Sequence, residues 1–128
     1  MQASQKVFLV KVEWQVGRYK EQLWAQLDTG FSGALVLPIT RLGELVSRLG
    51  NPDGFSWVEL ADGSQIRAPY YIGSVSVIGL GCHSPCHICL IGNKELVGLE
   101  LLESLNIVPD ILQALRSKGI VAEWTVDP

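Results

Sequence analysis

The chain has 128 residues, of which 48% are hydrophobic and 18% are charged, and its formal net charge is −3. This length suits one domain with a core of its own, and the hydrophobic fraction excludes intrinsic disorder in favour of a thick core or a large partner interface. The 10 Lys and Arg residues are scattered along the chain, so no basic patch indicates a nucleic-acid partner. We therefore expect a single domain, residues 1–128, that does not bind nucleic acid.

The N-terminal region and the cysteines indicate the cellular compartment of the protein. The first apolar run, Val7 to Val10, ends at Lys11 and is too short for the hydrophobic region of a secretory signal. No uncharged apolar run elsewhere approaches the roughly 20 residues of a membrane-spanning helix. Three cysteines close together fit reduced thiols better than a disulfide framework: Cys82, Cys86 and Cys89. The sequence predicts a cytoplasmic protein that does not enter a membrane.

The first predicted elements are a hairpin and a short strand. Two runs rich in strand-forming residues, 7–14 and 21–27, are separated by a segment that contains Gly17, which predicts a β-hairpin. The second strand of this hairpin places Asp28 at its end. The apolar run Leu35 to Leu37 predicts a short buried strand.

A helix is predicted next, opened by Pro38 and Thr40 and closed by Gly50. Its apolar residues recur at i, i+3, i+4 and i+7, so they share one face that we expect to be buried: Leu42, Leu45, Val46 and Leu49.

The rest of the chain predicts further strands and two short helices. Residues 57–66 read as two strands joined by a two-residue Asp62-Gly63 turn, because this dipeptide tolerates positive φ. The nearby aromatic residues are interpreted as core or sheet-face residues: Trp57, Tyr70 and Tyr71. Other strands are expected at 71–78, 87–91 and 120–126, with helices after Gly98 and after Pro109.

Three landmarks follow one another along the chain. The first is the segment LDTGFSGALVLP, residues 27–38, which carries Asp28-Thr29-Gly30 between two apolar runs. The second is the hairpin at Asp62-Gly63, and the third is Leu96-Val97-Gly98, followed by Leu101 and Leu102. In this order they resemble the catalytic loop, the flap and the strand beside the catalytic loop of retropepsin-like aspartic proteases. The resemblance is closest to small prokaryotic members whose loop reads Asp-Thr-Gly-Phe.

The resemblance covers about residues 5–106 and implies both a fold and a reaction. The fold is a mainly β, retropepsin-like lobe, a closed or partly open β-barrel with two or three short helices. The reaction is peptide-bond hydrolysis by two carboxylates about 3 Å apart that share one proton. Because the chain contains one Asp-Thr-Gly loop, the resemblance implies a homodimer in which each subunit supplies Asp28. No cofactor is expected.

The same resemblance assigns the site. Asp28, Thr29 and Gly30 would be catalytic, and a peptide or protein substrate would contact two groups of residues: Phe31 and Ser32 after the loop, and Ala61, Asp62 and Gly63 in the flap. Phe31 replaces the Ala or Ser of better-known members and adds bulk beside the substrate. The tail, residues 107–128, departs from the family because a predicted helix precedes the last strand.

Two alternatives remain open at this stage. One is a catalytically weak dimerisation or peptide-binding module on the same fold. The other is a metal-binding domain organised by Cys82, Cys86 and Cys89, whose spacing matches an iron–sulfur loop, with zinc ligation by His83 and His87 as a variant. We expect no metal, because strand alternation would turn Cys86 and Cys89 to opposite faces and because His83-Ser84-Pro85 reads as a hairpin turn.

Overall fold

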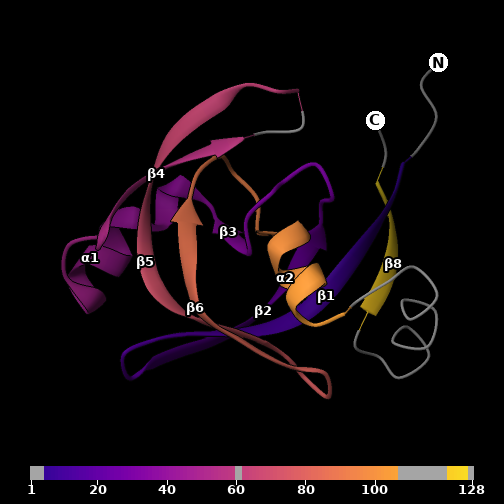
Figure 1. Cartoon of the computed structure of the whole chain (residues 1–128), viewed down its shortest axis with the longest axis horizontal. Coiled ribbons are helices and arrows are strands. Elements are labelled where there is room, and N and C mark those ends of the chain that lie inside the picture. The colour runs from indigo at the N-terminus through magenta and orange to yellow at the C-terminus, as the bar shows by residue number, and fades with distance from the viewer. Residues whose placement is uncertain (1–4, 60–61, 107–120, 127–128) are drawn as a thin grey trace.

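The computed structural model describes residues 5–59, 62–106 and 121–126, and within them the chain is mainly β (Figure 1). One sheet contains eight strands: β1 Gln5–Val16, β2 Tyr19–Leu27, β3 Leu35–Leu37, β4 Gly54–Glu59, β5 Gln65–Val77, β6 Gly81–Leu90, β7 Leu96–Val97 and β8 Val121–Val126. The helices among the described residues are the 3-10 turn η1 Ile39–Arg41, α1 Leu42–Leu49 and α2 Leu99–Ser104. In the described segments, no helix has the length and apolar character needed to cross a bilayer.

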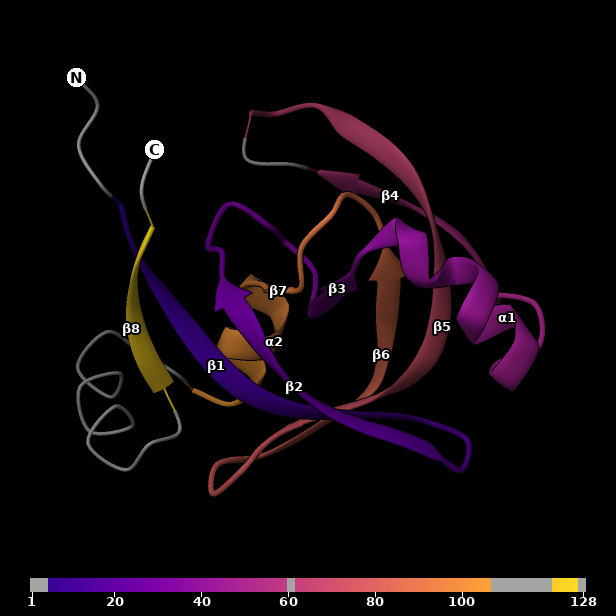
Figure 2. The ribbon, with the colours of Figure 1, turned by 180° about the vertical axis from the view of Figure 1, so that it is seen from behind.

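The sheet closes on itself. Its strand order is β4-β5-β6-β3-β7-β2-β1-β8, and an additional pairing of β5 with β1 turns the six strands from β5 to β1 into a ring. Two pairings are parallel, β2 with β7 and β3 with β6, and the others are antiparallel. Figures 1 and 2 show the β1–β2 and β5–β6 hairpins crossing at the bottom of the molecule, opposite the β4–β5 hairpin.

The predicted first hairpin is confirmed. Val16 pairs with Tyr19, so two residues form the turn, and Gly17 there has a φ of +57°, a value that glycine adopts without steric cost. Inward-facing residues alternate along β1, where the buried side chains are those of Val10, Val12 and Trp14.

The side chains that the structure describes form two buried apolar clusters. The larger one fills the ring and includes Trp14, Leu45, Tyr71 and Leu101. The smaller one lies under the β4–β5 hairpin and consists of Phe31, Val36, Val58, Ala68, Cys89 and Ile91. Each fully buried large apolar side chain contributes about 1.5–3 kcal/mol. The smaller cluster therefore anchors the segment after Asp28 to the underside of that hairpin.

The predicted helix after Pro38 is present as η1 followed by α1. Leu45 is fully buried, while Leu42 and Leu49 are partly buried against the larger cluster and Val46 is also partly exposed. The expected apolar face is thus confirmed, although its edges reach solvent.

Two expectations for the middle of the chain are wrong. Glu59 pairs with Gln65, so residues 60–64 connect β4 to β5 and the turn is longer than two residues. Val77 pairs with Gly81, which puts the next hairpin turn at residues 78–80 and leaves the segment His83-Ser84-Pro85 inside β6. Of the aromatic residues expected in the core or on a sheet face, Tyr71 is buried in the core, and Trp57 on β4 is 69% exposed.

The end of the chain is described only in its last strand. The helix expected after Pro109 lies outside the described residues. The strand expected at 120–126 is confirmed as β8, which pairs antiparallel with residues 5–10 of β1 in the same chain. Figure 1 shows β8 beside β1 at the edge of the sheet.

Candidate functional site

The Asp28-Thr29-Gly30 segment begins a loop between two strands that share a neighbour. β2 ends at Leu27 and β3 begins at Leu35, and both pair with β7, which lies between them in the sheet. The Asp28 N–H donates to the Val97 carbonyl oxygen at 2.9 Å. The loop therefore leaves the sheet on one side of β7 and re-enters it on the other.

The start of α2 holds this loop from behind. Three consecutive backbone N–H groups donate to it: Gly98 to the Ala34 carbonyl at 3.1 Å, Leu99 to Phe31 at 2.9 Å and Glu100 to Gly33 at 3.2 Å. The first N–H groups of a helix have no partner inside the helix, so the loop carbonyls satisfy them. The loop is thereby fixed by backbone contacts.

Gly98 is required by this close approach. A Cβ atom at this position would lie 2.4 Å from the carbonyl oxygens of both Phe31 and Gly33. Backbone atoms cannot move aside as a flexible side chain can. The apolar-apolar-glycine pattern of residues 96–98 thus has a steric cause.

The Asp28 side chain is partly exposed at the start of the loop. Its Oδ1 accepts the Gly30 N–H at 2.9 Å, and its backbone carbonyl accepts the Phe31 N–H at 3.2 Å. Thr29 and Gly30 are exposed. A tight turn therefore presents one carboxylate to solvent, and Thr29 lies beside it on the surface.

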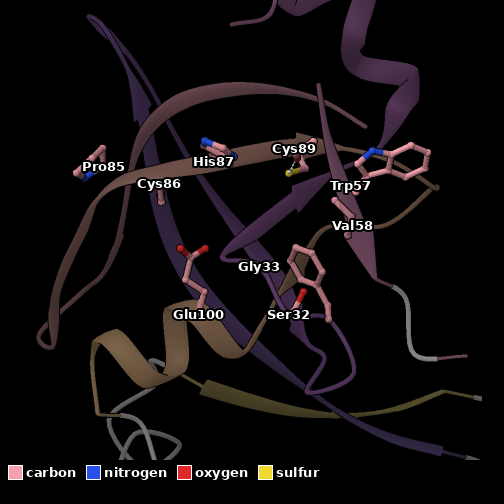
Figure 3. Close-up of a pocket in the computed structure, with 11 residues that line it drawn as sticks. Ser32, Gly33, Trp57, Val58, Pro85, Cys86, His87, Cys89 and Glu100 are labelled. Carbon is pink, nitrogen blue, oxygen red and sulfur yellow. Dashed lines mark hydrogen bonds between the residues drawn. The ribbon is translucent and has the colours of Figure 1, made fainter. Parts of the chain in front are cut away.

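A cavity of about 270 Å³ lies next to this loop (Figure 3). Eleven residues from the loop, β4, β6 and α2 line it: Phe31, Ser32, Gly33, Ser56, Trp57, Val58, Pro85, Cys86, His87, Cys89 and Glu100. Of the predicted substrate contacts, Phe31 and Ser32 belong to the lining. Asp28 does not line the cavity, nor do Asp62 and Gly63, and Ala61 lies outside the described residues.

The thiols in the cavity wall are held neutral. Burial raises the pKa of Cys86 to about 12, with a further increase from the negative charge of Glu100. Burial also raises the pKa of Cys89, although a hydrogen bond with Ser56 opposes this. Because only the thiolate is a strong nucleophile and metal ligand, Cys86 and Cys89 behave here as small apolar side chains.

Sequence reasoning missed nine of the eleven lining residues, among them Trp57, Cys86, His87 and Glu100. Trp57 and Glu100 were hidden because nothing in the local pattern shows that β4 and the first turn of α2 face the same cavity. The nearest available signal was the position of Glu100 two residues after Gly98, since residues 96–98 were expected beside the loop.

The described residues do not support the metal-binding alternative. No group of three or more His, Cys, Asp or Glu residues there is placed to hold a metal ion. Cys82 is exposed on β6, whereas the other two cysteines are buried.

No protein-family model matches the chain, and no curated protein matches it.

Proposed function

We propose that this chain is a retropepsin-like aspartic endopeptidase that hydrolyses peptide bonds as a homodimer. The observation that carries the proposal is the attachment of the Asp28-Thr29-Gly30 loop to β7 and α2 through Val97 and Gly98. A fixed loop suits catalysis because reacting groups must be held in one geometry. The closed ring of strands also supports the proposal, because such a lobe is expected to be mainly β.

The chemistry needs two Asp28 carboxylates, one from each subunit. The ionised carboxylate takes a proton from water while the water oxygen bonds to the carbonyl carbon of the substrate. The protonated carboxylate donates a hydrogen bond to the carbonyl oxygen as negative charge develops on it. The tetrahedral intermediate then collapses, the C–N bond breaks and the leaving nitrogen takes a proton from the pair.

The neighbours of Asp28 have supporting roles. Exposed Thr29 is available to hydrogen-bond the partner's loop across the two-fold axis, and Gly30 brings its N–H close to the carboxylate without a Cβ in the way. Ser32 and Phe31 border the substrate. The β4–β5 hairpin acts as the flap, with Asp62 and Gly63 in the connection between its strands.

The dimer interface includes the Asp28 loops. In retropepsins the chain ends of both subunits interleave, but here β8 already pairs with β1 of its own chain. β1 and β8 of each subunit therefore pair with each other. In the proposed dimer, the Asp28 loops make the contact across the two-fold axis.

The direct test is cleavage of a mixed peptide library by the wild-type protein and by Asp28→Asn. Asparagine is nearly isosteric but can neither ionise nor share the proton, so we expect cleavage to fall below a few per cent of wild type, while circular dichroism stays unchanged. Glu13→Gln, which removes a carboxylate from the β1–β2 hairpin, is the matched control and should keep full activity. Substantial cleavage by Asp28→Asn would place the chemistry elsewhere.

A catalytically weak peptide-binding module is the second candidate. The observation in its favour is that the cavity beside the loop does not include Asp28. For such a module, peptides would bind equally to wild type and Asp28→Asn, and neither protein would cleave them.

A further inference from the structure

We propose that the cavity beside the Asp28 loop binds a lysine or arginine side chain of the substrate, with Glu100 as its charge partner. This inference rests on the proposed function and specifies which peptides the site prefers. It follows from the size, the walls and the charge of the cavity.

The size fits one long side chain. At about 270 Å³ the cavity falls just below the ~300 Å³ at which sites for whole small-molecule ligands begin. A single extended side chain from a bound peptide can enter such a space, with room left for water.

The walls suit an aliphatic stem. Phe31 and Val58 are buried and belong to the smaller apolar cluster, and Trp57 is 69% exposed at the cavity. Lysine and arginine cover apolar surfaces with their methylene groups and keep the charged head at a polar end. An exposed indole also attracts a cation over its face.

Glu100 supplies the negative end. Figure 3 shows its carboxylate pointing from α2 into the space below Cys86. The other lining residues include no aspartate, lysine or arginine. Its backbone is fixed, because the Glu100 N–H donates to the Gly33 carbonyl.

The carboxylate lacks a strong partner of its own. Among the described residues its ionic neighbour is His83, whose Nε2 lies 3.5 Å away and forms no hydrogen bond. Glu21 offers a contrast, because Arg41 binds both of its carboxylate oxygens. A lysine or arginine side chain of the substrate would pair with Glu100 as Arg41 pairs with Glu21.

The test compares cleavage of paired peptides that carry either lysine or norleucine at the position whose side chain enters the cavity and are otherwise identical. Wild type should favour lysine, and Glu100→Gln should lower kcat/KM for the lysine peptide about tenfold, since the amide can accept a hydrogen bond from the ammonium group but carries no charge to pair with it. The norleucine peptide should be little affected. Glu100→Lys should turn the preference toward glutamate at the same position. Glu103→Gln, an exposed neighbour on α2 outside the cavity, is the matched control and should behave as wild type.

The outcomes separate this inference from the proposed function. Cleavage that depends on Asp28 but treats lysine and norleucine alike, in wild type and in Glu100→Gln, would overturn the inference and leave the peptidase intact. If no peptide is cleaved, fluorescence anisotropy of the two labelled peptides decides. Lysine-selective binding that is lost in Glu100→Gln supports the site, and equal binding of both peptides overturns it.

Discussion

Gly98 lies where the start of α2 meets the loop after Asp28. Because it has no side chain, the helix and the loop can approach each other closely. Its backbone is extended, with φ −119° and ψ −172°, so an alanine would meet no conformational penalty there. The cost of a side chain comes from contact alone, with the carbonyl oxygens of Phe31 and Gly33.

Gly98→Ala should therefore destabilise the protein by about 2 kcal/mol or more, as added atoms do in a tightly packed site. Urea unfolding measures the change, and activity should fall with it because the loop must shift. Gly43→Ala in α1 is the matched control, since a Cβ there meets nothing within 4 Å. It should stabilise the helix by about 0.5–1 kcal/mol. Equal stability of Gly98→Ala and wild type would contradict the close approach.

At the residue scale, the sequence predicted the position of Asp28 at a strand end and the place of Gly98 beside its loop. It did not predict that Trp57 is exposed or that Glu100 faces a cavity. Both depend on how separate elements pack, and one sequence carries no record of that packing. A large aromatic residue in a strand is usually buried, so the local rule fails where the strand borders a cavity.

An ion pair links β2 to the first helical segment. Arg41 at the end of η1 donates from Nη2 to Glu21 Oε2 at 2.7 Å and from Nη1 to Oε1, in a bidentate arrangement. The hydrogen bonds from Arg41 lower the pKa of Glu21, against the opposing effect of burial. Arg41 also contacts Glu44 at 2.8 Å, but that carboxylate is more exposed.

Glu21→Gln should lower the free energy of unfolding at neutral pH by about 1–3 kcal/mol, the usual effect of losing a hydrogen bond to a charged group. Because the folded-state pKa is depressed, this stabilisation is present above the ordinary value of 4.5 and is lost as the pH falls through the lower, folded-state value. Wild type and variant should therefore converge in stability in that acidic range. Thermal unfolding across the pH range measures it.

Glu44→Gln serves as the control and should change stability by less than about 0.5 kcal/mol, as exposed pairs do. A constant difference between wild type and Glu21→Gln down to the most acidic conditions would contradict the assignment.

At the element scale, local patterns predicted the β1–β2 hairpin and the helix after Pro38. In both cases the residue propensities, the spacing of apolar residues and a glycine at the turn or helix end predict the same element. The β5–β6 hairpin was misplaced because His83-Ser84-Pro85 has turn-forming composition. In the structure β6 continues through this segment: His83 pairs with Val75 and Cys86 with Gly73, and the register is irregular between these two pairs. Cross-strand pairing outweighed local preference there.

For the whole molecule, the proposal requires a dimer. A single Asp-Thr-Gly loop cannot supply two carboxylates, so two chains of 14.0 kDa should associate about a two-fold axis. Light scattering after gel filtration should give about twice the chain mass, and specific activity should fall on dilution as the dimer dissociates. Full activity in a sample that contains only the single-chain mass would exclude the shared site.

Mixing wild type with Asp28→Asn tests the shared site most directly. If each active centre needs Asp28 from both subunits, mixed dimers are inactive, and equal amounts of the two proteins should retain about half the activity of the wild type alone after exchange. A threefold excess of the variant should leave about a quarter. Activity that stays proportional to the wild-type protein, despite demonstrated subunit exchange, would contradict a site built from two Asp28 carboxylates.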